Sequence, residues 1–132
     1  MWPLVAAAFL LAHGLIHVSY VTKPPVVEAG APPWPFRLDA SWGLSRLGVT
    51  SGVQRRSGVV LTAAVVTCFA AAAVVLAVGS PVWQTIAAVA ASLSLVQLVV
   101  WFHPWLSFGL LIDAAILATV LGIWSLHALP GT

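Results

Sequence analysis

Charge is the first thing that this sequence lacks, because only 6% of its 132 residues are Asp, Glu, Lys or Arg. A soluble fold would have almost no charged side chains for its surface, while 61% of the residues are hydrophobic. Five Lys and Arg residues are too few for a surface that follows nucleic-acid phosphates. The composition therefore argues against a soluble protein and a nucleic-acid-binding protein, and it predicts a chain whose main solvent is lipid.

Cysteine and the common catalytic motifs are also scarce or missing. The single cysteine, Cys68, excludes an intrachain disulfide and lies in an apolar run, where we expect it to pack as a small hydrophobic side chain. The sequence has no Gly-rich phosphate loop, no serine-hydrolase elbow, no HExxH and no CxxC. It leaves open whether the protein is an enzyme.

What the chain has instead is four apolar runs of about 20 residues, which at 1.5 Å per residue match a hydrocarbon core about 30 Å thick. Because lipid offers no hydrogen-bond partners to the backbone, we expect each run to be a helix. No basic residue precedes the first run, so we expect a spanning helix there and not a cleaved signal peptide. The predicted fold class is all-α, a single four-helix transmembrane bundle over residues 1–132, with helices at about residues 2–21, 58–78, 82–102 and 105–126.

The connections between these helices differ in length. Gly79-Ser80-Pro81 predicts a tight turn between the second and third helices, and His103-Pro104-Trp105 predicts another between the third and fourth. One long loop, residues 23–56, joins the first two helices, and its proline-rich first half cannot be regular helix. Its second half, Phe36 to Val53, mixes apolar, small and charged residues and predicts a short amphipathic piece at the membrane surface.

The basic residues predict the orientation of the bundle. All of them lie in the long loop, which the positive-inside bias places in the cytoplasm, so both termini should lie on the non-cytoplasmic side. Tryptophan prefers the headgroup level, and the tryptophans fit the same topology, with three at the outer ends of helices and four at the inner level. The basic residues are Lys23, Arg37, Arg46, Arg55 and Arg56; the outer tryptophans are Trp2, Trp83 and Trp124, and the inner ones are Trp34, Trp42, Trp101 and Trp105.

Polar residues within the predicted spans can then be given depths. His13 and His17 lie four residues apart, on one face of the first helix, and Tyr20 continues that stripe. Measured from the inner end, His17 lies about 6 Å deep and His13 about 12 Å deep. In the last helix Asp113 also lies about 12 Å deep, and Gln97 lies about 8 Å deep in the third. The sequence therefore gathers these side chains in the cytoplasmic half of the bundle.

Asp113 is the only carboxylate within a predicted span. A carboxylate that faces lipid would cost several kcal/mol, so we expect Asp113 to point into the bundle with His13 as its partner. This pairing requires the first and last helices to be neighbours. The buried stripe of the last helix would then contain Leu110, Asp113, Leu117, Val120 and Trp124.

Several kinds of site fit these residues. His13 and His17 could chelate a divalent metal, with Asp113 or His103 completing the shell. Haem fits poorly, because two histidines on one helix face cannot supply opposite axial ligands. The same side chains could instead form a structural hydrogen-bond network, or bind a ligand or proton. Arg37 and Arg46 could bind an anionic headgroup or substrate at the inner mouth, although such residues more often form a solvated interfacial face.

Two segments of the chain resemble a known pattern. Ala12-His13-Gly14-Leu15-Ile16-His17 and the run FGLLIDAAIL at residues 108–117 resemble an uncharacterised group of small bacterial four-helix integral membrane proteins. The resemblance implies the same architecture, a bacterial inner membrane and a role for the two segments. It implies no activity.

The leading functional hypothesis is a polar His/Asp pocket in the cytoplasmic half that binds a small ligand, proton or metal ion. Its ligand-binding residues would be His13, His17, Tyr20, Gln97 and Asp113, with Arg37 and Arg46 at the mouth. One alternative is a non-catalytic accessory subunit of a larger membrane partner. Another is a membrane enzyme that acts on a lipid or quinone-like substrate. The expected partners are the lipid bilayer and either a second copy of the chain or a larger membrane protein.

Overall fold

The computed structural model describes residues 1–22, 30 and 34–127, and for the last five of these only the backbone. Over this part of the chain the only regular secondary structure is helical, with no strand. The long helices are α1 (Trp2–Ile16), α3 (Ser51–Ala77), α4 (Trp83–Val100) and α5 (Ser107–His127). Three short helices accompany them, namely η1 (His17–Tyr20), α2 (Trp42–Arg46) and η2 (Pro104–Leu106).

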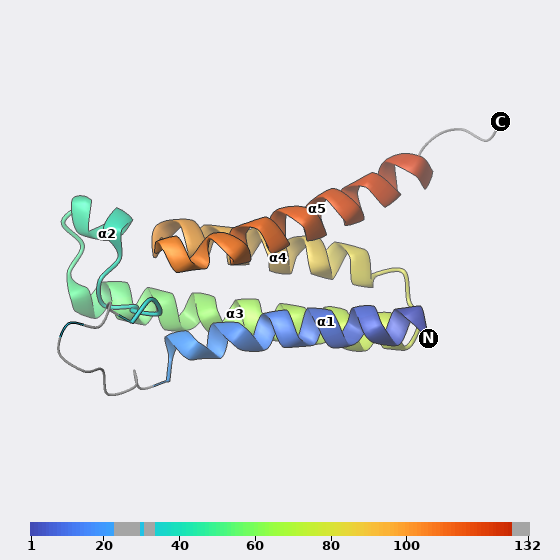
Figure 1. The fold of residues 1–132 in the computed structure, drawn as a ribbon, viewed down its shortest axis with the longest axis horizontal. Helices are drawn as coiled ribbons and strands as arrows, with labels where there is room; N and C mark the ends of the chain where they lie inside the picture. Colours follow the sequence, from blue (N-terminus) through green and yellow to red (C-terminus); the bar gives the residue numbers. More distant parts are fainter. Residues whose placement is uncertain (23–29, 31–33, 128–132) are drawn as a thin grey trace.

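Four helical segments are long and apolar enough to cross a membrane, namely Trp2–Tyr20, Ser51–Ala77, Trp83–Val100 and Pro104–Gly122. The four predicted apolar runs are therefore four helices, and the chain is a multi-pass membrane protein. Helix α1 packs on α3, α3 on α4, and α4 on α5. Figure 1 shows the four long helices side by side, with α2 at one end of the bundle and the start of α1 and the end of α5 at the other.

Helix α3 is longer than the apolar run that predicted it. It begins at Ser51, seven residues before the expected start at Gly58, and its 27 residues span about 40 Å. That exceeds the roughly 30 Å of a hydrocarbon core, so the first turns of α3 project beyond it. Arg55 and Arg56 therefore lie on a helix, and the predicted loop boundary at residue 56 is wrong. The apolar run marks only the lipid-facing part of this helix.

The two short connections follow the predicted turn chemistry. Gly79 has φ of +78° after α3, and the amides of Gly79 and Ser80 donate to the carbonyls of Leu76 and Val75. This is the Schellman arrangement, which satisfies the last carbonyls of a helix. At the other turn His103 is extended, as a residue before proline should be, and Pro104 opens η2.

The connecting segment, residues 34–50, closes one end of the bundle. Ser41 Oγ donates to the carbonyl of Val100 at 2.5 Å, and Trp42 Nε1 donates to that of Val99 at 2.6 Å. Trp101 Nε1 in turn donates to the Leu38 carbonyl at 3.0 Å. Helix α4 thus obtains partners for carbonyls that a helix leaves free at its C-terminus. Only α2 within this segment is helical, so the predicted amphipathic piece is short.

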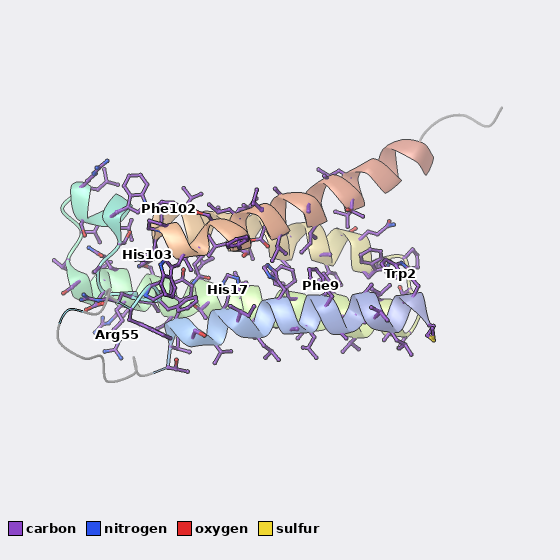
Figure 2. All side chains as sticks on the ribbon, in the orientation of Figure 1. Trp2, Phe9, His17, Arg55, Phe102 and His103 are labelled. Atoms are coloured by element: carbon purple, nitrogen blue, oxygen red, sulfur yellow. The ribbon has the colours of Figure 1, made fainter. Side chains whose placement is uncertain are left out.

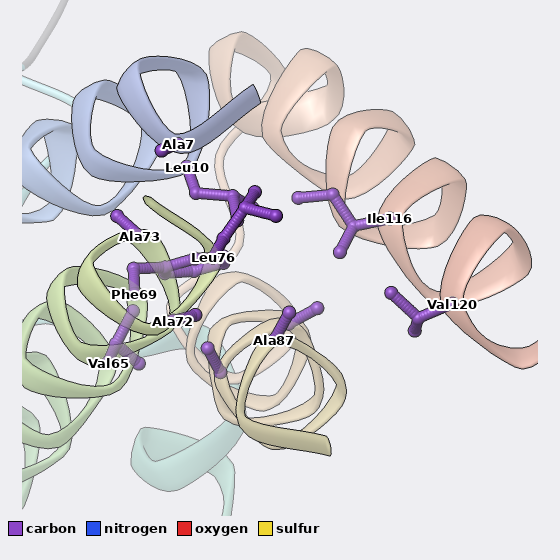
Figure 3. Close-up of a cluster of buried hydrophobic side chains, with 12 residues drawn as sticks. Ala7, Leu10, Val65, Phe69, Ala72, Ala73, Leu76, Ala87, Ile116 and Val120 are labelled. Atoms are coloured by element: carbon purple, nitrogen blue, oxygen red, sulfur yellow. The ribbon is translucent and has the colours of Figure 1, made fainter. Parts of the chain in front are cut away.

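The apolar core lies between all four long helices and consists mainly of small side chains around Phe69, which is fully buried (Figure 3). Small residues let transmembrane helices approach closely, because lipid supplies no hydrophobic force between them. Gly14 shows how closely α1 and α3 pack: a Cβ there would lie 2.5 Å from the Phe69 Cβ. The buried cluster is Ala7, Leu10, Val65, Phe69, Ala72, Ala73, Leu76, Ala87, Ala90, Ala91, Ile116 and Val120.

Candidate functional site

Six buried polar side chains form one continuous hydrogen-bonded cluster inside the bundle, which we call the polar network. All four spanning segments contribute to it. Each member is 5% exposed or less, so the network lies in the protein interior and away from lipid. Its members are His13 and His17 from the first span, Thr62 from α3, Ser94 and Gln97 from α4, and Asp113 from α5.

One end of the network is the pair formed by His13 and Asp113. His13 Nε2 lies 2.8 Å from Asp113 Oδ1, and the carboxylate is completely buried. The second carboxylate oxygen accepts a hydrogen bond from the Ser94 hydroxyl. The predicted partnership of the two residues is thus present, and it joins α1 to α5 even though these two helices do not pack closely along their length.

The second histidine is linked to the first through Ser94. Ser94 Oγ lies 3.0 Å from His17 Nε2, and His17 Nδ1 lies 3.2 Å from Gln97 Oε1. The amide of Gln97 then donates to Thr62 Oγ1 at 2.6 Å. A continuous path of hydrogen bonds therefore leads from His13 through the carboxylate to His17 and on to α3.

The proton of Ser94 determines the direction of these bonds. Because the Ser94 hydroxyl donates to Asp113, it can only accept from His17, so His17 Nε2 carries a proton. If His17 is doubly protonated, its Nδ1 donates to the Gln97 carbonyl. If His17 is neutral, its Nδ1 is an acceptor, and the Gln97 amide must turn over. The Gln97 NH₂ then donates to His17 Nδ1, and the Thr62 hydroxyl donates to the Gln97 carbonyl. The network can therefore bind one additional proton on His17 when the hydrogen bonds of the Gln97 amide and the Thr62 hydroxyl reverse.

A cavity of about 180 Å³ adjoins the network between the C-terminal half of α1 and the N-terminal half of α5. Its walls are mainly apolar, and its polar lining residues are His13, His17 and Tyr20. Figure 2 places His17 inside the bundle, between Trp2 at one end and the labelled Arg55, Phe102 and His103 at the other. The full lining is His13, Ile16, His17, Tyr20, Phe36, Leu98, Trp105, Leu106, Phe108, Gly109 and Ile112.

Two residues on the cavity wall have polar atoms without partners. His13 Nδ1 and the Tyr20 hydroxyl are both buried and make no hydrogen bond. The ring of Tyr20 stacks on His17, with centroids 6.1 Å apart, so it continues the predicted stripe. An unpaired buried polar group costs about 1–3 kcal/mol, so both atoms would be stabilised by a partner.

The other predicted site residues lie elsewhere. Arg37 forms an exposed ion pair with Asp39 at 3.1 Å, and its hydrogen bonds lower the pKa of that carboxyl below its ordinary value. The guanidinium of Arg46 lies 5.0 Å from the Trp42 ring centroid. Neither arginine lines the cavity. Both arginine side chains are exposed.

The predicted metal-ligand set is not assembled. His103 lies at the turn between α4 and α5, where its Nδ1 accepts from the Trp105 amide at 3.3 Å. His13 and Asp113 bind each other. Within the described residues, no group of three or more His, Cys, Asp or Glu side chains is arranged to hold a metal ion.

Ser94 and Thr62 are the network members that sequence reasoning missed. Both are buried and both receive or donate hydrogen bonds within the network. Ser and Thr in membrane helices commonly bond to their own backbone, as Ser92 does to the Ala88 carbonyl at 2.8 Å, so their presence in a span is a weak signal. The spacing in α4 could have identified Ser94, because it lies three residues before Gln97 and hence on the same face of the helix.

Comparison with protein-family models, curated proteins and solved structures found no match to this chain.

Proposed function

We propose that this membrane protein binds a small ligand in the cavity beside the polar network, and that the network is the polar end of the binding site. The observation that supports this most directly is that the cavity and the network share His13 and His17. Binding pockets are typically apolar with a few converging polar groups, and this cavity has that composition. An ionisable residue inside a membrane span is also expensive to keep, which favours a functional role for Asp113.

A proton-handling role belongs to the same proposal. His-Asp pairs exchange protons near neutral pH, and the network joins two imidazoles through one carboxylate and one hydroxyl. A ligand that contacts His13 would change how the single proton between His13 and Asp113 is shared. Ligand binding and proton binding would then be coupled at these residues. A divalent metal is the weaker form of the proposal, because it would have to break the His13–Asp113 bond.

Purification of the protein from its native membrane tests the proposal. We expect a small molecule in about one copy per chain, identified by mass spectrometry after solvent extraction. Ile16→Trp should abolish its retention, because Ile16 lines the cavity while its side chain is largely exposed. Leu15→Trp is the matched control, since Leu15 is equally exposed on α1 but outside the cavity.

Two results would contradict ligand binding in this cavity: wild-type protein without any stoichiometric small molecule, or equal retention by the two tryptophan variants. A specific larger protein that co-purifies in place of a small molecule would support the accessory-subunit alternative.

We further propose that the protein lies in the bacterial inner membrane, with the basic end of the bundle in the cytoplasm. Arg37, Arg46, Arg55 and Arg56 are all exposed or partly exposed and lie in the connecting segment or the first turns of α3. Lys23 and the side chain of Trp124 lie outside the described residues. This distribution supports the orientation with both termini on the non-cytoplasmic side, through the positive-inside bias.

Cysteine labelling tests this orientation. In a Cys68→Ala background, a membrane-impermeant maleimide should label Ser80→Cys on intact cells and should label Leu47→Cys only after permeabilisation. Ser80 lies in the turn after α3 and Leu47 is 78% exposed after α2, so both positions are accessible to reagent. The reverse pattern would show that the bundle is inserted the other way.

A further inference from the structure

The volume of the cavity restricts the ligand that it can hold. An apolar cavity of about 150 Å³ in another protein accommodates benzene. The cavity between α1 and α5 has about 180 Å³, so it has room for one six-membered ring with small substituents. A nucleotide or a whole phospholipid is too large.

The chemistry of the walls restricts the ligand further. Phe36, Trp105 and Phe108 supply aromatic surface, and Leu98, Leu106 and Ile112 supply aliphatic surface. Of the described residues, no Lys, Arg, Asp or Glu lines the cavity, because Asp113 lies behind His13. A cationic ligand would therefore lose its hydration without gaining a counter-ion, and an anionic ligand would gain one only from a protonated histidine. The walls favour an uncharged aromatic ring.

The polar atoms at the end of the cavity beside the polar network favour a ligand with a hydroxyl group. The carboxylate of Asp113 accepts from His13 Nε2, which leaves Nδ1 of a neutral His13 as an acceptor without a partner; this atom is covered in the structure, so a ligand hydroxyl reaches it only when the side chains over it shift. A Ser-His-Asp triad has the same arrangement: the acid binds one nitrogen of the histidine, and the other nitrogen accepts a proton from a hydroxyl. Both nitrogens of His17 are already engaged, so His13 is the available acceptor. The unpaired Tyr20 hydroxyl offers a second polar contact.

The way into the cavity is from the side, through the lipid. Three of its lining residues, Ile16, Trp105 and Phe108, are 55%, 68% and 77% exposed. They come from α1, η2 and α5, and α1 and α5 do not pack closely against each other. A ligand with an apolar tail can thus place its ring in the cavity while the tail remains in the bilayer.

Resting on the proposed function, we propose that the ligand is a hydroxylated aromatic ring on a lipid-soluble tail, whose hydroxyl donates a hydrogen bond to His13 Nδ1. Two sources share this chemistry, a membrane quinol and an alkylphenol. The ring fills the cavity, the hydroxyl meets the polar network, and the tail passes between Ile16 and Phe108.

Three probes test this ligand class with the full-length protein in lipid nanodiscs: 4-hexylphenol, hexylhydroquinone and hexylbenzene. We expect saturable binding of 4-hexylphenol about tenfold tighter than that of hexylbenzene, because one hydrogen bond to a buried partner separates them. Tighter binding of hexylhydroquinone than of 4-hexylphenol, with the difference lost in Tyr20→Phe, identifies a quinol as the source. Equal affinities for the two hydroxylated probes identify an alkylphenol.

Variants of His13 leave Asp113 without its partner, so the role of His13 is best observed in the wild-type protein. The ¹⁵N resonance of His13 Nδ1 should move with 4-hexylphenol and remain in place with hexylbenzene. Ile16→Trp should abolish binding of every probe, while Leu15→Trp should leave it unchanged.

The outcomes separate the ligand class from the proposed function. Equal binding of 4-hexylphenol and hexylbenzene, both blocked by Ile16→Trp, would overturn the hydroxyl assignment and leave ligand binding in the cavity intact. Absence of probe binding together with a different co-purified molecule would overturn the ligand class alone. Absence of both would overturn the two proposals together.

Discussion

Asp113→Ala should lower the free energy of unfolding by about 2–3 kcal/mol, whereas Asp113→Asn should cost less than about 1 kcal/mol. Alanine removes the acceptor of the His13 Nε2 proton and the acceptor of the Ser94 hydroxyl proton in the interior. Asparagine can satisfy both, since its carbonyl accepts from His13 and its amide donates to Ser94. Unfolding in mixed detergent–lipid micelles measures the difference, with the lipid-exposed Leu111→Ala as the control.

Asparagine should also reverse the hydrogen bonds beyond Ser94. Once Ser94 accepts from the new amide, its hydroxyl proton is free to donate to His17 Nε2, and we expect the proton of His17 to move to Nδ1. There it donates to the Gln97 carbonyl, for which the geometry is already present at 3.2 Å. ¹⁵N spectroscopy of His17 reports this change of tautomer.

Ser94→Ala tests whether the effect of Asp113→Asn reaches His17 through the Ser94 hydroxyl. If the signal passes through the Ser94 hydroxyl, Asp113→Asn should leave the His17 tautomer unchanged in a Ser94→Ala background. Ser92→Ala is the matched control, because Ser92 bonds only to its own helix on the exposed side of α4. A His17 tautomer that does not respond to Asp113→Asn in the wild-type background would contradict the hydrogen-bond directions given above.

Gly14→Leu should have the second large effect, a loss of about 3 kcal/mol in the free energy of unfolding. Even the first added carbon would lie 2.5 Å from the Phe69 Cβ, which is attached directly to the backbone of α3. Phe69→Ala cannot relieve this contact, because alanine keeps the Cβ. The helices must separate, and His13 next to Gly14 would move away from Asp113.

Gly122→Leu is the matched control for the Gly14 prediction. Gly122 lies in α5, is exposed, and has nothing within 4 Å of an added Cβ. Leucine is also the better helix former by roughly 0.5–1 kcal/mol, so this variant should be as stable as the wild type or slightly more stable. Similar losses in both variants would show that the cost lies in the glycine backbone and not in the contact between α1 and α3.

The sequence predicted the elements of the fold well because each depends on local chemistry. Apolar runs of membrane length gave four spans, and Gly79 and Pro104 gave the turns that the structure contains. The depths of His13 and Asp113 followed from helical rise alone, and these two residues meet. The start of α3 was missed because its first turns leave the hydrocarbon and no longer carry an apolar signal.

The faces of the helices were harder to predict. In a soluble protein, polar residues mark the outer face of a helix, but here lipid and interior are both apolar. The stripe predicted for α5 includes Leu117, which is only partly buried, while the neighbouring Ile116 is buried. Asp113 gave the direction of the stripe correctly, because a carboxylate is the one side chain that lipid excludes strongly.

By itself the sequence determined that the chain crosses a membrane four times and that an acid and two imidazoles lie at similar depths. Only the tertiary structure decided that His13 and Asp113 share a hydrogen bond, that Ser94 and Thr62 complete the network, and that a cavity adjoins it. The reason is physical. Spanning is a property of one helix and its solvent, whereas a site between helices depends on which apolar faces pack together, and those faces look alike in sequence.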